Sequence, residues 1–362
     1  MGFVKEIGSE FDYNSTKQVF VKGCNYFEKQ YSNYQVHKFR SGRDALKSVA
    51  IFYKQTHKKV LLPALCCESM VSPFLMNGYE IDFYKFNEDI SIDLEDVCKK
   101  ITEDTVFLYQ AYFGIEPISK DNLEELKRKN NKTIFLEDRT HVALNNVNDS
   151  EFMPDVIVAS IRKWVGLPDG GLLFSKDKVD FEKEVDKDGT FSSMRLKAMR
   201  KKSRYLKNKN KKLKEEYLEI LKKASLELDL SKNAYKISKK SEKILSKIDF
   251  LKILDKRINN INLLKKLISS LACNNKIKII DNYTSVGNLY FPIFVENRDL
   301  IQSKLAKNGV YCPVIWPIPN EAIGVCEVSE SIANNILALP IDQRYNEEDM
   351  KYIADTLESV LR

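Results

Sequence analysis

The sequence has few of the residues that build metal sites, disulfide frameworks or membrane spans. Histidine occurs only three times, so a histidine-based metal site is poorly supplied. The seven cysteines are scattered and odd in number, without the paired spacing of a zinc site or a secreted disulfide framework. No apolar run approaches the ~18 residues of a transmembrane helix, and the first ten residues contain no signal-peptide-like apolar core. We therefore expect a cytoplasmic protein with reduced thiols, no metal and no membrane contact.

The composition is that of an ordinary globular protein. The 362 residues are 43% hydrophobic and 30% charged, which suits one large or two medium domains. Much of the net charge of +7 lies in a lysine-rich stretch at 197–252 with few aromatic residues. A nucleic-acid surface would combine arginine with stacking rings, so this stretch predicts solvated helix faces and no nucleic-acid partner.

Strand-like and helix-like segments alternate along the first half of the chain. Short apolar runs occur at 58–65, 79–86, 105–114, 133–138, 156–160 and 171–174, and helical patterns separate most of them. Alternation with short connections predicts an α/β fold with a mainly parallel sheet between layers of helices. Residues 1–35 suggest an extended arm with a short helix.

The second half predicts a different organisation. A long helical stretch, rich in lysine near 190–250, is followed by short strands and two helices that indicate a small α+β domain. We place a large domain at 1–250, which includes the N-terminal arm, and a smaller C-terminal domain at 251–362.

Two buried strand-like runs end abruptly in polar groups. Asp138 and His141 follow the first run, and Ser160 and Lys163 follow the second. Strand ends in open α/β sheets are where sites form. A carboxylate that keeps a ring nitrogen protonated, beside an amine that forms a Schiff base, suggests pyridoxal phosphate. Taken alone, however, these residues favour a buried salt bridge or solvated loop charges.

A Ser-Gly pair stands directly before a helical run that begins near Ala45. Free N–H groups at a helix N-terminus can bind an anion such as a phosphate. Ser41 can equally be an ordinary N-cap residue, and the pattern alone leaves both interpretations open.

Six segments, in this order, resemble motifs of one family: SGRDAL at 41–46, LLPALCCES at 61–69, YFGIEP at 112–117, LEDRTH at 136–141, SIRKW at 160–164 and LALPIDQRYNEEDM at 337–350. The family is that of the DegT/DnrJ/EryC1/StrS sugar aminotransferases, which are fold type I pyridoxal-phosphate enzymes. The resemblance covers nearly the whole chain and implies a seven-stranded type of sheet in the large domain.

The resemblance also implies roles for individual residues. Lys163 would form the Schiff base with the cofactor and later move the proton between cofactor and substrate. Asp138 would pair with the pyridinium nitrogen, and His141 would contact the phenolic oxygen of the ring. The phosphate would be held by two hydroxyls and two backbone amides, those of Ser160, Ser41, Gly42 and Arg43.

The chain departs from the family at several positions. Cys67 stands where an aromatic residue often stacks on the cofactor ring. Asn233 begins a segment, NAYKIS at 233–238, that is only weakly similar to the one through which a second subunit reaches the phosphate. Arg162 and Trp164 flank the lysine where many relatives have other residues, and Trp164 suits packing as well as substrate contact.

The family resemblance predicts an aminotransferase that moves an amino group from glutamate to a nucleotide-linked keto sugar, for polysaccharide or glycan synthesis, as a homodimer. One alternative is another fold type I reaction on a small keto or amino acid. A second is a non-catalytic binding or regulatory protein with the same fold, which the retention of both Asp138 and Lys163 disfavours.

Overall fold

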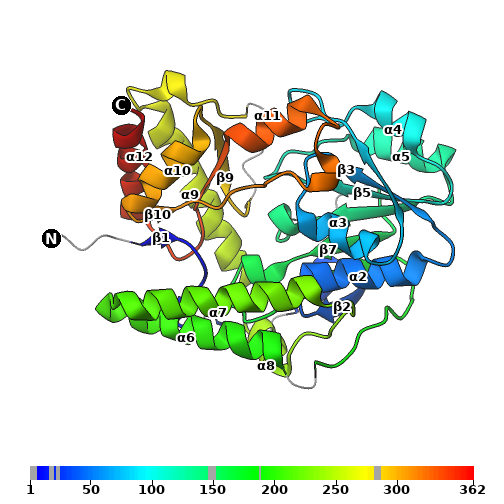
Figure 1. Ribbon diagram of the computed structural model, residues 1–362, viewed down its shortest axis with the longest axis horizontal. Coiled ribbons are helices and arrows are strands. Elements are labelled where there is room, and N and C mark those ends of the chain that lie inside the picture. Colours follow the sequence, from blue (N-terminus) through cyan, green and yellow to red (C-terminus); the bar gives the residue numbers. More distant parts are fainter. Residues whose placement is uncertain (1–5, 16–19, 22–24, 146–151, 187–188, 281–286) are drawn as a thin grey trace.

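The computed structural model describes residues 6–15, 20–21, 25–145, 152–186, 189–280 and 287–362 (Figure 1). Its centre is a seven-stranded sheet in the order β2-β8-β7-β6-β5-β3-β4. The strands are β2 (Gln35–Phe39), β3 (Lys59–Pro63), β4 (Glu80–Tyr84), β5 (Thr105–Gln110), β6 (Ile134–Asp138), β7 (Val156–Ala159) and β8 (Gly171–Ser175). The neighbours from β4 to β7 pair in parallel, whereas β8 is antiparallel to both β7 and β2. The predicted α/β fold with a mainly parallel sheet is confirmed.

Helices cover both faces of this sheet. The connecting helices are α2 (Gly42–Tyr53), α3 (Glu68–Leu75), α4 (Leu94–Lys100) and α5 (Lys120–Lys129). Val106 and Leu108 of β5 belong to the core beneath α2 and α3, whereas Phe107 belongs to the core that includes apolar residues of α4 and α5. This segregation follows from the two-residue period of a strand, so both faces of β5 are apolar.

The glycine pair at the start of β8 brings that strand against α2. A Cβ on Gly171 would lie 2.1 Å from the carbonyl carbon of Ser41, so only glycine fits there. Gly170 has a φ of 156°. The chain therefore turns back into the sheet beside the N-terminus of α2.

Two long helices pack against each other along the lower side of Figure 1, α6 (Thr190–Asn208) and α7 (Lys211–Leu230), and α8 (Lys239–Leu245) follows them. The end of α7 nearest β2 is tied to α2, because Arg40 and Arg43 pair with Glu227 and Asp229 of α7. The lysine-rich stretch thus forms helices, as predicted.

The C-terminal part joins strands and helices far apart in sequence. Its elements are α9 (Phe250–Ser269), β9 (Phe291–Phe294), α10 (Arg298–Lys307), β10 (Val310–Tyr311), α11 (Glu327–Asn335), β11 (Ile336–Leu339) and α12 (Glu347–Leu361). Strands β9 and β11 pair antiparallel, and α9 packs against α12. Strand β1 (Ile7–Gly8) pairs with β10, so the N-terminal segment lies beside this part, and the short helix α1 (Tyr26–Gln30) follows it. The division at 250/251 falls at the start of α9 and stays a prediction.

Within the described ranges, no helix combines the length and the apolar composition needed to cross a membrane.

Candidate active site

Asp138 ends β6 as a buried carboxylate at the carboxyl edge of the parallel strands. Its Oδ1 accepts a hydrogen bond from the Thr140 N–H at 2.7 Å, which fixes the orientation of the group. Burial raises the pKa of Asp138, while the Thr140 N–H and the charge of Lys163 oppose the rise. A buried carboxylate of this kind is stabilised by a cation beside it.

Lys163 lies in a 3-10 turn, Ile161–Lys163, that follows the neighbouring strand β7. Its backbone N–H donates to the Ser160 carbonyl at 3.2 Å, which closes the turn. Burial and the positive charges of Arg162 and Arg43 lower the pKa of Lys163, against the attraction of Cys67 and Asp138. The structure therefore brings the predicted lysine and acid into one electrostatic neighbourhood, in which the amine loses its proton more readily than a solvated lysine does.

His141 is buried in an aromatic cluster. Its ring centroid lies 4.4 Å from that of Phe113 and 5.2 Å from that of Trp316, which is stacked on it at 22°. Tyr112 meets Trp316 edge-on at 6.3 Å. Burial and the charge of Lys163 lower the pKa of His141 well below its usual value, so the ring is neutral near pH 7. Its Nδ1 is buried and has no hydrogen-bond partner among the described residues.

The sequence did not single out Phe113 or Trp316. Both are ordinary apolar residues in the linear sequence, and Trp316 comes from the C-terminal part, which the fold alone places against His141. No local spacing could have revealed this contact.

The start of α2 lies directly beside the end of β7. A Cβ on Gly42 would be 3.1 Å from the Ser160 Cβ, so the helix N-terminus and the turn before Lys163 are in close approach. The first amides of a helix have no intrahelical acceptor and can serve an anion there. Four of the predicted phosphate ligands thus converge on one place: Ser41, Gly42, Arg43 and Ser160.

The N-cap interpretation of Ser41 is confirmed. Its Oγ accepts from the Asp44 N–H at 3.0 Å and donates to the Asp44 carboxylate at 2.6 Å. Arg40 completes this buried group with two donations to the same carboxylate, each at 3.1 Å. Because the hydroxyl proton already has an acceptor, the role of Ser41 toward a phosphate stays a prediction.

Of the two remaining predicted residues, Cys67 acts electrostatically on Lys163 and Arg43, whereas Asn233 makes its contact elsewhere. Cys67 is the N-cap residue of α3, is half-buried, and its Sγ lies 2.8 Å from the Ser69 Oγ. Asn233 is exposed after α7 and donates to Glu184 at 2.8 Å. Neither contact tests the predicted role toward the cofactor.

Trp164 is a packing residue. It is fully buried, and its Nε1 donates to the Thr140 carbonyl at 2.7 Å, which joins the turn after β7 to the turn after β6. Arg257 of α9 lies over its ring at 4.5 Å. The indole therefore joins the turn that follows Asp138 to the turn that carries Lys163.

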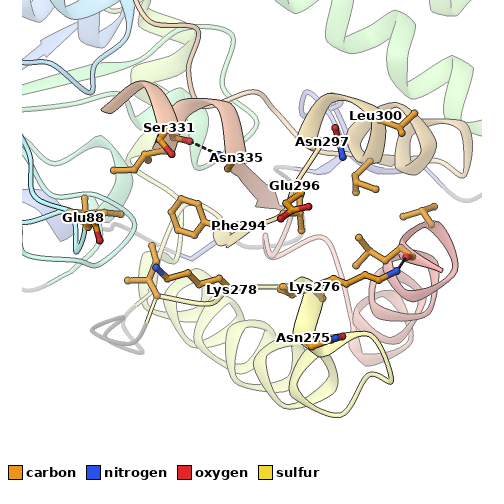
Figure 2. Close-up of a pocket in the computed structure, with 18 of the residues that line it drawn as sticks. Glu88, Asn275, Lys276, Lys278, Phe294, Glu296, Asn297, Leu300, Ser331 and Asn335 are labelled. Atoms are coloured by element: carbon orange, nitrogen blue, oxygen red, sulfur yellow. Dashed lines mark hydrogen bonds between the residues drawn. The ribbon is translucent and has the colours of Figure 1, made fainter. Parts of the chain in front are cut away.

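A cavity of about 1250 Å³ lies elsewhere, among α10, α11, α12 and the loop after β4 (Figure 2). Charges of both signs line it, among them Glu88, Lys278, Glu296 and Lys304. None of the residues predicted to hold the cofactor lines this cavity.

The sheet order and the position of Asp138 and Lys163 after the neighbouring strands β6 and β7 are the features of this chain to compare with known proteins. No family model matches the sequence, and no curated protein matches it either. The structure nevertheless superposes on solved sugar aminotransferases along nearly its whole length.

Three solved structures illustrate this likeness. The candidate sugar aminotransferase Spr1654 from Streptococcus pneumoniae, in its PMP form, has a TM-score of 0.67 at 14% identity, over 100% of this chain and 97% of that chain. PseC from Helicobacter pylori, an aminotransferase involved in pseudoaminic acid biosynthesis, has a TM-score of 0.63 at 15% identity, over 99% and 98%. DesI, solved in the presence of its TDP-sugar product, has a TM-score of 0.65 at 14% identity, over 96% and 88%. The chain therefore has the fold of sugar aminotransferases.

Proposed function

We propose that this chain is a pyridoxal-phosphate-dependent aminotransferase that moves an amino group from glutamate to a keto sugar. We further propose that the sugar is carried on a nucleotide and is used in polysaccharide or glycan synthesis in the cytoplasm. The observation that carries the proposal is the position of Lys163 and Asp138 at neighbouring strand ends, beside the N-terminus of α2. The likeness to structures such as PseC and DesI supports the sugar as acceptor.

The residues present fit the cofactor. A cationic ring N–H would stabilise the buried Asp138 carboxylate, since burial raises the pKa of that carboxyl. The Nδ1 of His141, which has no partner in the described part of the chain, offers a polar atom for the ring's phenolic oxygen. The amides at the start of α2, against Ser160, suit a phosphate. These groups lie around Lys163, whose amine would bond to the cofactor.

Each side chain has a defined task in this mechanism. Pyridoxal phosphate, when bound, supplies an electron sink for the carbon that loses its proton. The lowered pKa of Lys163, caused mainly by burial, leaves Nζ able to accept that proton and to deliver it to the other carbon. Asp138, oriented by the Thr140 N–H, stabilises a positive ring nitrogen. Phe113 and Trp316 cover His141 and exclude water from that side.

We also propose that the active form is a homodimer, in which the segment around the exposed Asn233 reaches the phosphate region of the second subunit. The exposed leucines of α7 support an interface on this helix: Leu218, Leu226 and Leu230. Sedimentation should give twice the chain mass, and an active monomer would contradict this part of the proposal.

Cofactor uptake tests the function directly. Purified protein given pyridoxal phosphate should turn yellow, should keep the cofactor on Lys163 after borohydride reduction and should bleach when glutamate is added. Lys163→Ala should form no reducible bond, whereas the exposed Lys129→Ala should behave as wild type. Protein that takes up no cofactor would overturn the proposal, and colour that glutamate does not bleach would exclude glutamate as donor.

A further inference from the structure

Four arginines surround the N-terminus of α2 and the turn that carries Lys163. Three of them already have carboxylate partners: Arg40 pairs with Asp44 and Glu227, Arg43 with Asp229, and Arg195 with Glu10 at 2.7 Å. These pairs hold α2, α7, α6 and the N-terminal segment together. Their positive charges are therefore largely compensated within the chain.

Arg162 is the exception among these four. Its backbone N–H donates to the Gly170 carbonyl at 3.1 Å, but its guanidinium makes no hydrogen bond or ion pair with any residue that the structure describes. The Nε atom is buried and unpartnered. Arg162 is half-buried and its enclosed Nε has no acceptor in the described structure, so an anion that reaches this guanidinium would be bound favourably.

The other charges near Arg162 indicate where its guanidinium lies. Burial together with Arg195 lowers the pKa of Arg162 to about 10, and Glu10 opposes the change; Arg43 and Asp44 of α2 contribute less. The group thus lies toward α6 and the N-terminal segment. In the described structure no hydrogen bond or ion pair joins Glu10 to Arg162; the Glu10 carboxylate accepts from Arg195 and acts on Arg162 only through its charge. The Nε of Arg195 is also buried without a partner in the described structure.

We propose that Arg162, together with Arg195, binds an oxyanion of the substrate beside Lys163. This inference rests on the proposed function and adds to it the residues that orient the substrate. The oxyanion is a carboxylate of the amino donor or a phosphoryl group of the acceptor, since a planar guanidinium fork binds either with two parallel hydrogen bonds. The charge of Arg162 acts on Lys163, so this contact would hold the substrate near the reacting amine.

The inference is tested by binding of two probes that cannot react. Glutarate carries the donor's two carboxylates without its amine, and inorganic phosphate stands for the acceptor's phosphoryl group. Calorimetric titration of the cofactor-loaded protein should show that Arg162→Gln weakens one of them by about 10- to 100-fold, the loss expected for a charge-assisted pair of hydrogen bonds. Arg162→Lys should recover part of the affinity, and Arg128→Gln on the exposed face of α5 should change nothing.

The outcomes show whether Arg162 binds the donor carboxylate or the acceptor phosphoryl group, and whether it serves the substrate or the cofactor. Loss of glutarate binding assigns the donor carboxylate, and loss of phosphate binding assigns the acceptor. Wild-type protein that binds neither probe, or an Arg162→Gln variant that binds both normally, would overturn the inference. A variant with weaker cofactor affinity but unchanged probe binding would also overturn it, because Arg162 would then serve the cofactor phosphate.

If the wild-type chain takes up no cofactor, the same titrations on the cofactor-free protein still decide the matter. Binding that Arg162→Gln abolishes would keep the anion site and overturn only the proposed function. Thermal unfolding of each variant guards against a folding defect, and Arg162→Met, which keeps the apolar stem, replaces the Gln variant if that variant unfolds early.

Discussion

Two arginines on opposite sides of the segment Ile161–Trp164 differ in how their guanidinium groups are partnered. On one side, Arg257 is fully buried and its guanidinium donates to three backbone carbonyls and to Gln343. On the other side, Arg162 and Lys163 are partly buried, and the Arg162 guanidinium has no partner in the described structure. Burial lowers the pKa of both arginines to about 10. Burial of a cation therefore does not by itself mark a site, whereas a missing internal partner does.

The hydrogen bonds of Arg257 fix the position of the segments around the site. Arg257 holds the carbonyls of Asn288 and Leu289, and the Leu289 N–H in turn donates to the His141 carbonyl at 3.0 Å. The same guanidinium stacks on Trp164, which fixes Thr140. One buried cation thus ties both site turns to α9.

The largest effect expected from this contrast is on stability. Arg257→Met should lower the free energy of unfolding by about 3 kcal/mol, because it leaves the buried Asn288 and Leu289 carbonyls without donors. Urea unfolding of the cofactor-free protein measures this change. Arg162→Met is the matched comparison. Because the Arg162 guanidinium has no internal partner in the described structure, its removal should leave the free energy of unfolding unchanged or raise it by up to about 1 kcal/mol.

The opposite result would contradict the distinction between Arg257 and Arg162. If Arg162→Met destabilises the protein as much as Arg257→Met does, the guanidinium of Arg162 has an internal structural role and the distinction between the two sides fails.

The sheet and the polar strand ends could be predicted because they depend on local patterns. Apolar runs flanked by turn residues located β3 to β8, and the change from apolar to polar residues at Asp138 and Lys163 marked the carboxyl edge. The strand β2, in the segment QVHKF, was not predicted. It alternates apolar and polar residues because it lies at the edge of the sheet, where β8 is its one strand partner among the described residues and an isolated bridge joins Phe39 to Lys236.

The surroundings of the site could not be predicted, because they depend on contacts between distant segments. The pair of Arg40 with Glu227 spans 187 positions, and the stacking of Trp316 on His141 likewise joins the C-terminal part to the end of β6. Sequence patterns report periodicity within an element and not which elements meet. Even at Ser41, the sequence indicated the helix cap but not the buried carboxylate that takes the hydroxyl proton.

The smallest expected effect is the pH dependence of stability that the buried Lys163 causes. Burial lowers the pKa of Lys163 in the folded protein below the ~10.4 of an unfolded lysine, so the folded state prefers the neutral amine. Below both pKa values the lysine is charged in both states, and the fold bears the full cost of the buried ammonium. As the pH rises above the lowered pKa this cost begins to fall, and it is gone only above the ~10.4 of the unfolded lysine, so the wild-type protein gains stability across that window.

Lys163→Met removes the buried charge and should therefore be more stable than wild type by about 1 kcal/mol near pH ~7, with the advantage shrinking toward pH ~10, close to the pKa of an unfolded lysine. Urea unfolding of both cofactor-free proteins at these two values measures the difference. The exposed Lys129→Met on α5 should show no such trend, since its ammonium is solvated in both states. An advantage for Lys163→Met that grows with pH would mean that the folded protein stabilises the ammonium, and would place Lys163 with the internally compensated cations instead of the site.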